Sequence, residues 1–532
     1  MKKQICVLLT AAMLAAALAG CGGSKQSAEG GSGAAPQAAA SSKDVLYHSY
    51  ASQPYITLDP RVENSNGVMV LHNVYETLTH YNDKTGQVEP LLATEWSAND
   101  DGTQWVFKLR EDVKFHDGTA MTAENVVKSI NKVKEMGMGA AYIWDAVTGV
   151  EATGDYEVTF TCSYAAPLDL ISSACYAGYV VSDAALEQTT EWFNQGNDGG
   201  TGPYTLAQAT GDTVVLKAFE DYRGGWQDNQ YKNVIIKETP ESSARRQLLE
   251  TGEAQITSLL SSTDVNSLKE QTNKVHVETF DTFTNLVILP NHEKEPTSNA
   301  DFRRALAYAF PYEETINNVL EGNGVQSHGI VTAGLWGHDE SLEQYTTDLD
   351  KAKEYLDKSG VDTTGMKLTI TYATGMDEYN NWAQLYQVNL KKLGIELVLQ
   401  PMEWDAQWNM GKATDPNDRQ DLFVFMWWPD YASPESWFTS MVRSEEEIYF
   451  NLGYIKNDEY DKLINDAIKS TANDRSKAEQ DYKEVQKGLV EECDFIFPYD
   501  KINTYIISNA IDGVYENPAY ASCINYYNVT KK

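Results

Sequence analysis

The sequence predicts an α/β protein built from two lobes with a cleft between them. Short strands of alternating apolar residues are interleaved with amphipathic helices, a pattern typical of sheets buried beneath helices. This alternation occurs in two regions, before and after about Pro290, so each region is expected to form its own lobe. Small ligands usually bind in the cleft between such lobes.

The local patterns predict individual strands and helices on both sides of Pro290. Residues 91–110 are expected to be strand material because Trp105, Phe107 and Leu109 alternate, and a helix is expected at 122–133 with Thr122 as its N-cap. Further strands are expected at 155–161, 214–219, 234–237, 395–400 and 422–427. Further helices are expected at 242–251, 301–320, 349–358 and 381–393.

The first twenty residues predict export. Lys2 and Lys3 precede an apolar run that ends at Leu18-Ala19-Gly20-Cys21, and this run is too short to cross a ~30 Å hydrocarbon layer comfortably. Residues 1–20 are therefore expected to be a signal peptide. The segment Leu-Ala-Gly-Cys resembles the bacterial lipobox, which implies that Cys21 becomes lipidated and anchors the chain to the cell membrane from outside the cytoplasm. Ordinary cleavage with a free Cys21 is the alternative.

The segment that follows is expected to be a flexible tether. Residues 21–43 consist mainly of Gly, Ser, Ala and Gln, which offer too little apolar surface to offset the entropy of ordering. The whole chain carries a formal net charge of −35, which repels nucleic acid and anionic lipid headgroups. Nucleic acid is therefore not an expected partner, and membrane contact is expected only through Cys21.

No metal centre, cofactor site or catalytic site is predicted. The cysteines beyond Cys21 are Cys162, Cys175, Cys493 and Cys523, and their spacing fits no metal-binding pattern. Bridges between the first two and between the last two remain open, as do buried thiols. The sequence also lacks Gly-x-Ser-x-Gly and His-Glu-x-x-His, so an enzyme is not expected.

Several segments, in this order, resemble the extracellular solute-binding proteins of the peptide and nickel importer family. The most specific is WVFKLREDVKFHDGTAMTAENVV, from Trp105 to Val127, where a strand, a His-Asp-Gly turn and a capped helix follow one another. His116 in that turn is expected to be structural. The other similar segments are 57–60, 74–78, 90–96, 200–204, 244–252, 301–306, 350–353 and 427–434.

The resemblance implies a periplasmic-binding-protein-like fold of type II, in the large cluster with an inserted sub-domain. Lobe I would comprise 44–88, 199–290 and 500–532, with 89–198 as the inserted sub-domain, and lobe II would comprise 291–499. Crossings near Pro290 and Tyr499 would form a hinge that closes over the ligand. The family implies a monomer that captures peptides and delivers them to the permease subunits of an ABC importer.

The resemblance also implies ligand-binding residues. Glu76-Thr77-Leu78 in one lobe and Met426-Trp427-Trp428 in the other would pair with the main chain of the ligand. Asp430 matches the aspartate that holds the ligand amine, and capping of a local turn is its alternative role. At least one of Trp427 and Trp428 is expected to face the pocket, with Trp427 favoured because it matches the family's tryptophan.

Other cargoes and one other class of protein remain open. The same fold could bind an oligosaccharide, which the twelve tryptophans would suit, or a nickel chelate. A remoter alternative is a secreted hydrolase that uses Glu403 and Asp405 as paired carboxylates. Peptide length, side-chain preference and the residue that meets the C-terminus of the ligand are not predicted.

Overall fold

The computed structural model describes residues 44–520 and 522–532. The expected signal peptide, tether and Cys21 lipid site lie outside these residues. Among the residues described, none of the helices combines the length and the apolar character needed to cross a membrane.

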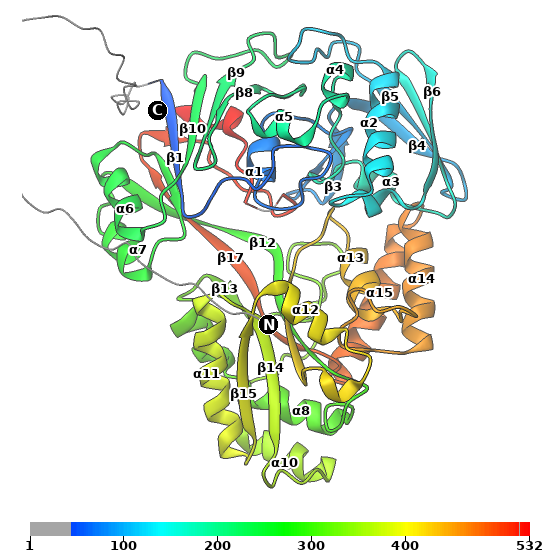
Figure 1. Ribbon diagram of the computed structural model, residues 1–532, viewed down its shortest axis with the longest axis vertical. Helices are drawn as coiled ribbons and strands as arrows, with labels where there is room; N and C mark the ends of the chain where they lie inside the picture. Colours follow the sequence, from blue (N-terminus) through cyan, green and yellow to red (C-terminus); the bar gives the residue numbers. More distant parts are fainter. Residues whose placement is uncertain (1–43, 521) are drawn as a thin grey trace, which may run out of the picture. The chain divides into compact units, whose positions relative to one another are not determined.

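Within the described residues, eleven strands form one mixed sheet that passes through both halves of the protein (Figure 1). The order is β15-β14-β16-β12-β17-β11-β1-β10-β9-β8, and β13 also pairs with β17. The strands are β1 (Val45–Tyr50), β8 (Tyr204–Ala209), β9 (Thr213–Ala218), β10 (Asn233–Glu238), β11 (Ile256–Ser258), β12 (Val275–Pro290), β13 (Gly324–Val325), β14 (Lys367–Ala373), β15 (Glu396–Met402), β16 (Leu422–Trp427) and β17 (Ile496–Ser508).

The long strands β12 and β17 connect the two halves. They pair antiparallel from Val275↔Ser508 to Ile288↔Ile496, and the register shifts between Asp281 and Asn285. From Phe283 to Pro290 every residue of β12 is buried, because both faces of the strand are covered there. The connection between the halves is therefore a pair of hydrogen-bonded strands. The hinge itself remains a prediction.

A separate antiparallel sheet lies in the first half, in the order β4-β5-β7-β6. Its strands are β4 (Ala93–Ala98), β5 (Gln104–Leu109), β6 (Val147–Gly154) and β7 (Glu157–Cys162). Trp105, Phe107 and Leu109 all lie on its buried face, as their alternation predicts. Two small antiparallel sheets of two strands each complete the strands: β2 (Thr79–Asn82) with β3 (Gln87–Pro90), and β18 (Ile511–Asp512) with β19 (Thr530–Lys531).

Helices cover the sheets. Thr122 is the N-cap of α2 (Ala123–Met136), and its backbone N–H donates to Asn125 Oδ1 at 2.8 Å, so the predicted cap is confirmed. The other α-helices are α1 (Val68–Leu71), α3 (Leu168–Ile171), α4 (Asp183–Leu186), α5 (Thr190–Asn194), α6 (Ser242–Thr251), α7 (Ser262–Lys269), α8 (Ala300–Ala309), α9 (Tyr312–Glu314), α10 (Leu349–Ser359), α11 (Asp377–Lys392), α12 (Trp404–Gly411), α13 (Glu435–Trp437), α14 (Asp458–Thr471) and α15 (Arg475–Glu491). The short 3₁₀ and π segments are η1 (Ala141–Trp144), η2 (Thr315–Val319), η3 (Pro416–Asp418), η4 (Phe438–Val442) and η5 (Tyr526–Asn528).

The prediction of one continuous helix at 301–320 is wrong. α8 ends at Ala309, Phe310 is extended with a ψ of 135°, and the chain resumes as α9 and the π segment η2. Pro311 causes this break, because it lacks an N–H and disfavours a helical conformation at the residue before it. The helix at 242–251 and the strand at 422–427 are confirmed with the bounds predicted.

His116 joins two segments of the first half. Its Nδ1 lies 2.5 Å from Asp198 Oδ1, and its Nε2 lies 2.8 Å from the carbonyl oxygen of Gly202. The side chains of His116 and Asp198 are both almost fully buried. The imidazole is therefore structural.

We expect His116→Ala to lower the free energy of unfolding by about 2 kcal/mol, because it leaves the buried carboxylate of Asp198 without its imidazole partner. Urea unfolding at pH 7 measures the change. His276→Ala is the matched control: His276 bonds Asn509 from a half-exposed position and should cost about 1 kcal/mol or less. Equal losses from the two variants would contradict the structural role of His116.

Candidate ligand-binding cleft

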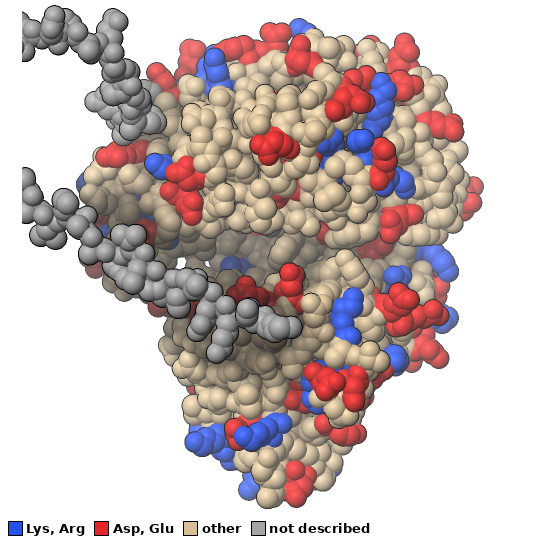
Figure 2. All heavy atoms as spheres, viewed as in Figure 1, with Lys and Arg blue, Asp and Glu red and all other residues tan. Residues whose placement is uncertain are grey.

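A cavity of about 940 Å³ lies between residues 134–171 of the first half and residues 430–469 of the second. Its volume falls within the range of about 300 to 1,000 Å³ that is usual for small-ligand sites. The face drawn in Figure 2 is hollowed between the same two halves. The charged residues in the cavity wall are of both signs: Lys134, Asp145, Asp430, Glu435, Arg443 and Lys469.

Asp430 lies in this wall, in the loop that follows β16. The hydroxyl of Tyr142, on η1 of the first half, lies 2.9 Å from each carboxylate oxygen of Asp430. No lysine, arginine or histidine of the described chain forms an ion pair with this carboxylate. Burial raises the pKa of Asp430 to about 6, and the hydrogen bond from Tyr142 opposes that rise. The site therefore contains a carboxylate that forms no ion pair with a cation of the described residues.

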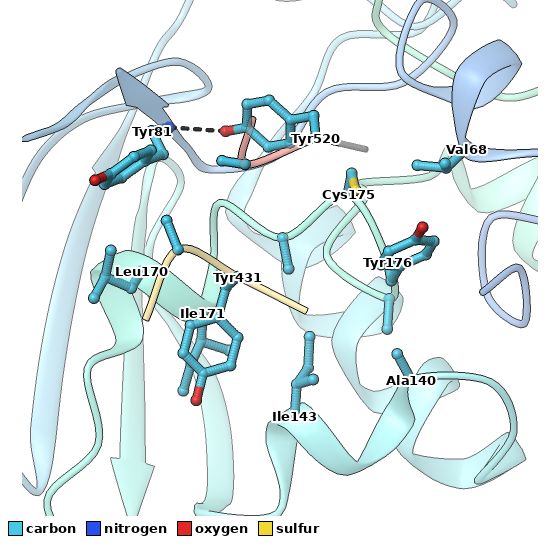
Figure 3. Packing of buried hydrophobic residues seen from close by; sticks show 14 of the residues in the cluster. Val68, Tyr81, Ala140, Ile143, Leu170, Ile171, Cys175, Tyr176, Tyr431 and Tyr520 are labelled. Atoms are coloured by element: carbon cyan, nitrogen blue, oxygen red, sulfur yellow. Dashed lines mark hydrogen bonds between the residues drawn. The ribbon is translucent and has the colours of Figure 1, made fainter. Parts of the chain in front are cut away.

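Tyr431 anchors the Asp430 loop against the first half. It belongs to the same buried cluster as Ile143, Leu170 and Ile171, and Figure 3 shows it beside Ile171. The aromatic ring and the aliphatic side chains exclude water from this side of the loop. Asp430 therefore stands at the boundary between an apolar contact and the cavity.

Trp427 and Trp428 point in opposite directions, as adjacent strand residues do. Trp427 is 8% exposed, and its indole N–H donates to Ser436 Oγ at 3.1 Å. Trp428 is 40% exposed and lines a second cavity of about 250 Å³ together with Met426 and Tyr176. The indole that faces a cavity is thus Trp428, whereas the sequence favoured Trp427. Contact of either indole with a ligand remains a prediction.

The backbone of β16 offers a strand edge beside Asp430. In the described ladder, β14 pairs with β16 only at Ile370↔Leu422 and Thr371↔Phe423. The next carbonyl oxygen, on Val424, accepts a hydrogen bond from the side-chain amide of Gln407 at 3.1 Å. The edge of β16 after Val424 is therefore not covered by β14, and it includes Met426 and Trp427.

The backbone of the segment Glu76-Thr77-Leu78 is already hydrogen-bonded to other residues of its own half, unlike the free edge of β16. Its three carbonyl oxygens accept from the N–H groups of Val180, Leu92 and Ala93 at 3.1, 3.3 and 2.8 Å. The wall of neither cavity described above includes any of the three residues. Pairing of this segment with a ligand remains a prediction, and it would have to rely mainly on groups other than these carbonyls.

The side chain of Glu76 belongs to a buried ion pair. Both guanidinium nitrogens of Arg223 lie 2.6 Å from its carboxylate oxygens, and Thr201 Oγ1 donates to it at 2.9 Å. The hydroxyl of Tyr222 donates a further bond at 3.2 Å. Glu76 therefore fixes the segment in place through its side chain.

The structure also bears on the disulfide bridges, the paired carboxylates and the metal site that the sequence analysis considered. Cys162, Cys175 and Cys493 are buried thiols, so neither of the two bridges considered is formed within the described chain. Glu403 and Asp405 are exposed at the start of α12 and do not enclose a cleft. No cluster of three or more His, Cys, Asp or Glu side chains suited to a metal ion occurs among the described residues.

Three polar residues that shape the chemistry of the main cavity were not predicted: Tyr142, Glu435 and Arg443. Tyr142 belongs to the opposite half, so nothing in its neighbourhood in the sequence links it to Asp430. Glu435 and Arg443 follow Asp430 within the same segment, and that proximity is the only signal that could have found them.

Comparison with known proteins identifies the family. Residues 87–447 match the family described as bacterial extracellular solute-binding proteins, family 5 Middle. The chain belongs to this family. It is 30% identical to the probable D,D-dipeptide-binding periplasmic protein DdpA of Escherichia coli (strain K12), over 93% of this chain and 95% of that protein. It is 26% identical to the oligopeptide-binding protein AppA of Bacillus subtilis (strain 168), over 86% of each chain.

Solved structures show the same fold. HbpA2 from Haemophilus parasuis has a TM-score of 0.79 at 20% identity and covers 92% of this chain and 100% of its own. DppA from Helicobacter pylori, solved with the peptide STSA, has a TM-score of 0.75 at 22% identity and covers 92% and 98%. The predicted two-lobed, type II periplasmic-binding-protein fold is confirmed.

Glu76→Gln should lower the free energy of unfolding by about 3 kcal/mol, because it leaves the buried guanidinium of Arg223 without a carboxylate. Urea denaturation monitored by tryptophan fluorescence measures this loss. Glu95→Gln serves as the control, since Glu95 pairs with Lys108 at an exposed position, where water screens the pair, and its loss should be much smaller than that at position 76. A variant at position 76 as stable as the wild type would show that the ion pair does not hold this segment.

Proposed function

We propose that this family member captures peptides with a free amino terminus and delivers them to an ABC importer. The observation that carries the proposal is the carboxylate of Asp430, which faces a cavity between the halves without a cation from the described chain. A ligand ammonium would supply both the missing charge and three hydrogen-bond donors. The relatives named for dipeptide and oligopeptide binding support a peptide as the cargo.

The backbone near Asp430 suits the rest of a peptide. The edge of β16 that includes Met426 and Trp427 can pair with a ligand main chain, which is common to all peptides. Trp428 would provide a rigid apolar wall for a side chain. Oligosaccharides and nickel chelates lack a primary ammonium for Asp430, and binding of either one is an outcome that the test below distinguishes.

We further propose that the protein works as a membrane-anchored monomer without catalytic activity. A lipid on Cys21 would hold the protein at the membrane, close to the permease subunits that receive its cargo. The anchor and the permease contact rest on the sequence of the N-terminal segment and on the family.

The first test compares free and N-acetylated peptides. A panel of di- and tripeptides should include ligands that stabilise the protein by about 2.7 kcal/mol at 100 times their Kd. For the tightest of these, Asp430→Asn should weaken binding by about 3 kcal/mol, because the ammonium is then enclosed without a counter-charge. Isothermal titration calorimetry measures the change in Kd.

The control for this test is Asp145→Asn, because Asp145 lines the same cavity but is exposed. It should change Kd by less than about threefold. N-acetylation should weaken binding to the wild type about as much as Asp430→Asn does. Equal affinity for the acetylated and free peptides, or stabilisation by oligosaccharides or Ni²⁺ salts alone, would overturn the proposal.

The affinity should also depend on pH. The pKa of Asp430 is raised to about 6 in the ligand-free cleft, and the ammonium binds the ionised carboxylate. Acidification from pH 7 to pH 5 therefore protonates Asp430 and should weaken binding about tenfold. Calorimetry at pH 7, 6 and 5 measures the loss. Asp430→Asn should not show it, and an equal pH dependence in that variant would assign the titration to another group.

A further inference from the structure

The two halves also meet outside the main cavity, at the turn between α14 and α15 (Figure 1). Arg475, the first residue of α15, forms an ion pair with the carboxylate of Asp169 on α3 of the first half. Asn473, in the same turn, donates from its side-chain amide to the carbonyl oxygen of Asp100 at 3.0 Å. None of these four residues belongs to the wall of the main cavity. The contacts therefore join the halves at a place that the ligand does not occupy.

Asp169 is held by the first half but finds its cation in the second. Its carbonyl oxygen accepts from Thr79 Oγ1 at 2.7 Å, and its side chain is only 10% exposed. Arg475 is the only cation that pairs with this carboxylate in the described chain, where the other oxygen, Oδ1, is buried without a hydrogen-bond partner. Exposed ion pairs contribute little, but removing the cation from a nearly buried carboxylate is costly. Separation of the halves would therefore cost the protein this pair.

A glycine lets the two turns approach this closely. Gly102 lies in the turn between β4 and β5 with a φ of 68°. A Cβ atom added to it would lie 2.9 Å from Cβ of Ala472, in the turn of the second half, and 3.1 Å from Cβ of Ala165. Contacts that short do not occur between real Cβ atoms, so a side chain at position 102 would push the turns apart. The absence of one here brings Asn473 and Arg475 within reach of the first half.

We propose that Arg475 and Asp169 form a latch that holds the two halves together around a bound ligand. Arg475 is a positioning residue in this role, because it stabilises the arrangement that encloses the ligand without contacting the ligand itself. The inference goes beyond the proposed function and rests on it only for the identity of the ligand. A contact made when the halves meet slows their separation, so it lengthens the time that the ligand stays bound and hardly changes the rate of its entry.

The test measures the association and dissociation rates of the two tightest peptides of the panel by stopped-flow tryptophan fluorescence. Arg475→Gln should raise the dissociation rate of both peptides about tenfold and change their association rates by less than about twofold. Asp169→Asn should have the same effect, and the double variant should be no worse than either single variant, because all three lack the same ion pair. Arg475→Lys keeps the charge and should recover part of the loss.

Lys477→Gln is the matched control. Lys477 lies on the same helix as Arg475 but pairs with Asp481 within that helix and is half-exposed, so both rates should stay within about twofold of the wild type. Thermal unfolding without ligand checks that each variant is folded, and Asp169→Asn and Arg475→Lys keep the test decisive if one variant does not fold.

Unchanged dissociation rates in Arg475→Gln would overturn the latch while the proposed function stands. A loss that differs between the two peptides, or that lies in the association rate, would also overturn it, because Arg475 would then act on the ligand itself. If no peptide binds the wild type, the proposed function fails and small-angle X-ray scattering of the ligand-free proteins tests the latch alone. Arg475→Gln should then have a larger radius of gyration than the wild type, and equal radii would overturn the latch.

Discussion

The site depends on a carboxylate that is held beside apolar side chains and has no ion-pair partner among the residues that the structure describes. Asp430 can occupy this position because β16 ends shortly before it and because Tyr431 packs into the cluster that contains Ile143 and Ile171. The packing shields the loop from water, which makes an unneutralised charge there expensive and a bound ammonium favourable. The hydroxyl of Tyr142 provides the only hydrogen bonds described for this carboxylate, and hydroxyl bonds are weaker than those from an ammonium.

The halves are joined by strands that also position this loop. Asn285 lies on β12 where the register shifts, and its Oδ1 accepts from the indole N–H of Trp437 at 3.0 Å while its Nδ2 donates to the carbonyl oxygen of Ile330 at 2.7 Å. Trp437 belongs to α13, between Asp430 and Arg443. Asn285 therefore ties β12 directly to the segment that follows Asp430.

Much of the local structure could be predicted from the sequence. The cap at Thr122, the helix α6 and the strand β16 depend on neighbouring residues, so their periodicity and capping patterns identified them. The break in the helix at Pro311 was missed because the apolar period continues across it, although the missing N–H at that residue could have indicated it. The crossing strands β12 and β17 were not predicted as one ladder, since pairing between residues more than 200 positions apart leaves no local signal.

The sequence alone determined the α/β class and the order of segments that resembles the solute-binding family. It also placed Asp430 after a buried strand and showed no familiar catalytic motif. These properties depend on residue types and short spacings, which a sequence displays directly. Only the tertiary structure decided which side chains share the cavity. It brought Tyr142 to Asp430, turned Trp428 rather than Trp427 to a cavity, and committed Glu76 to Arg223. The physical reason is that burial and ion pairing depend on contacts between distant segments, and only the packing of the two halves determines those contacts.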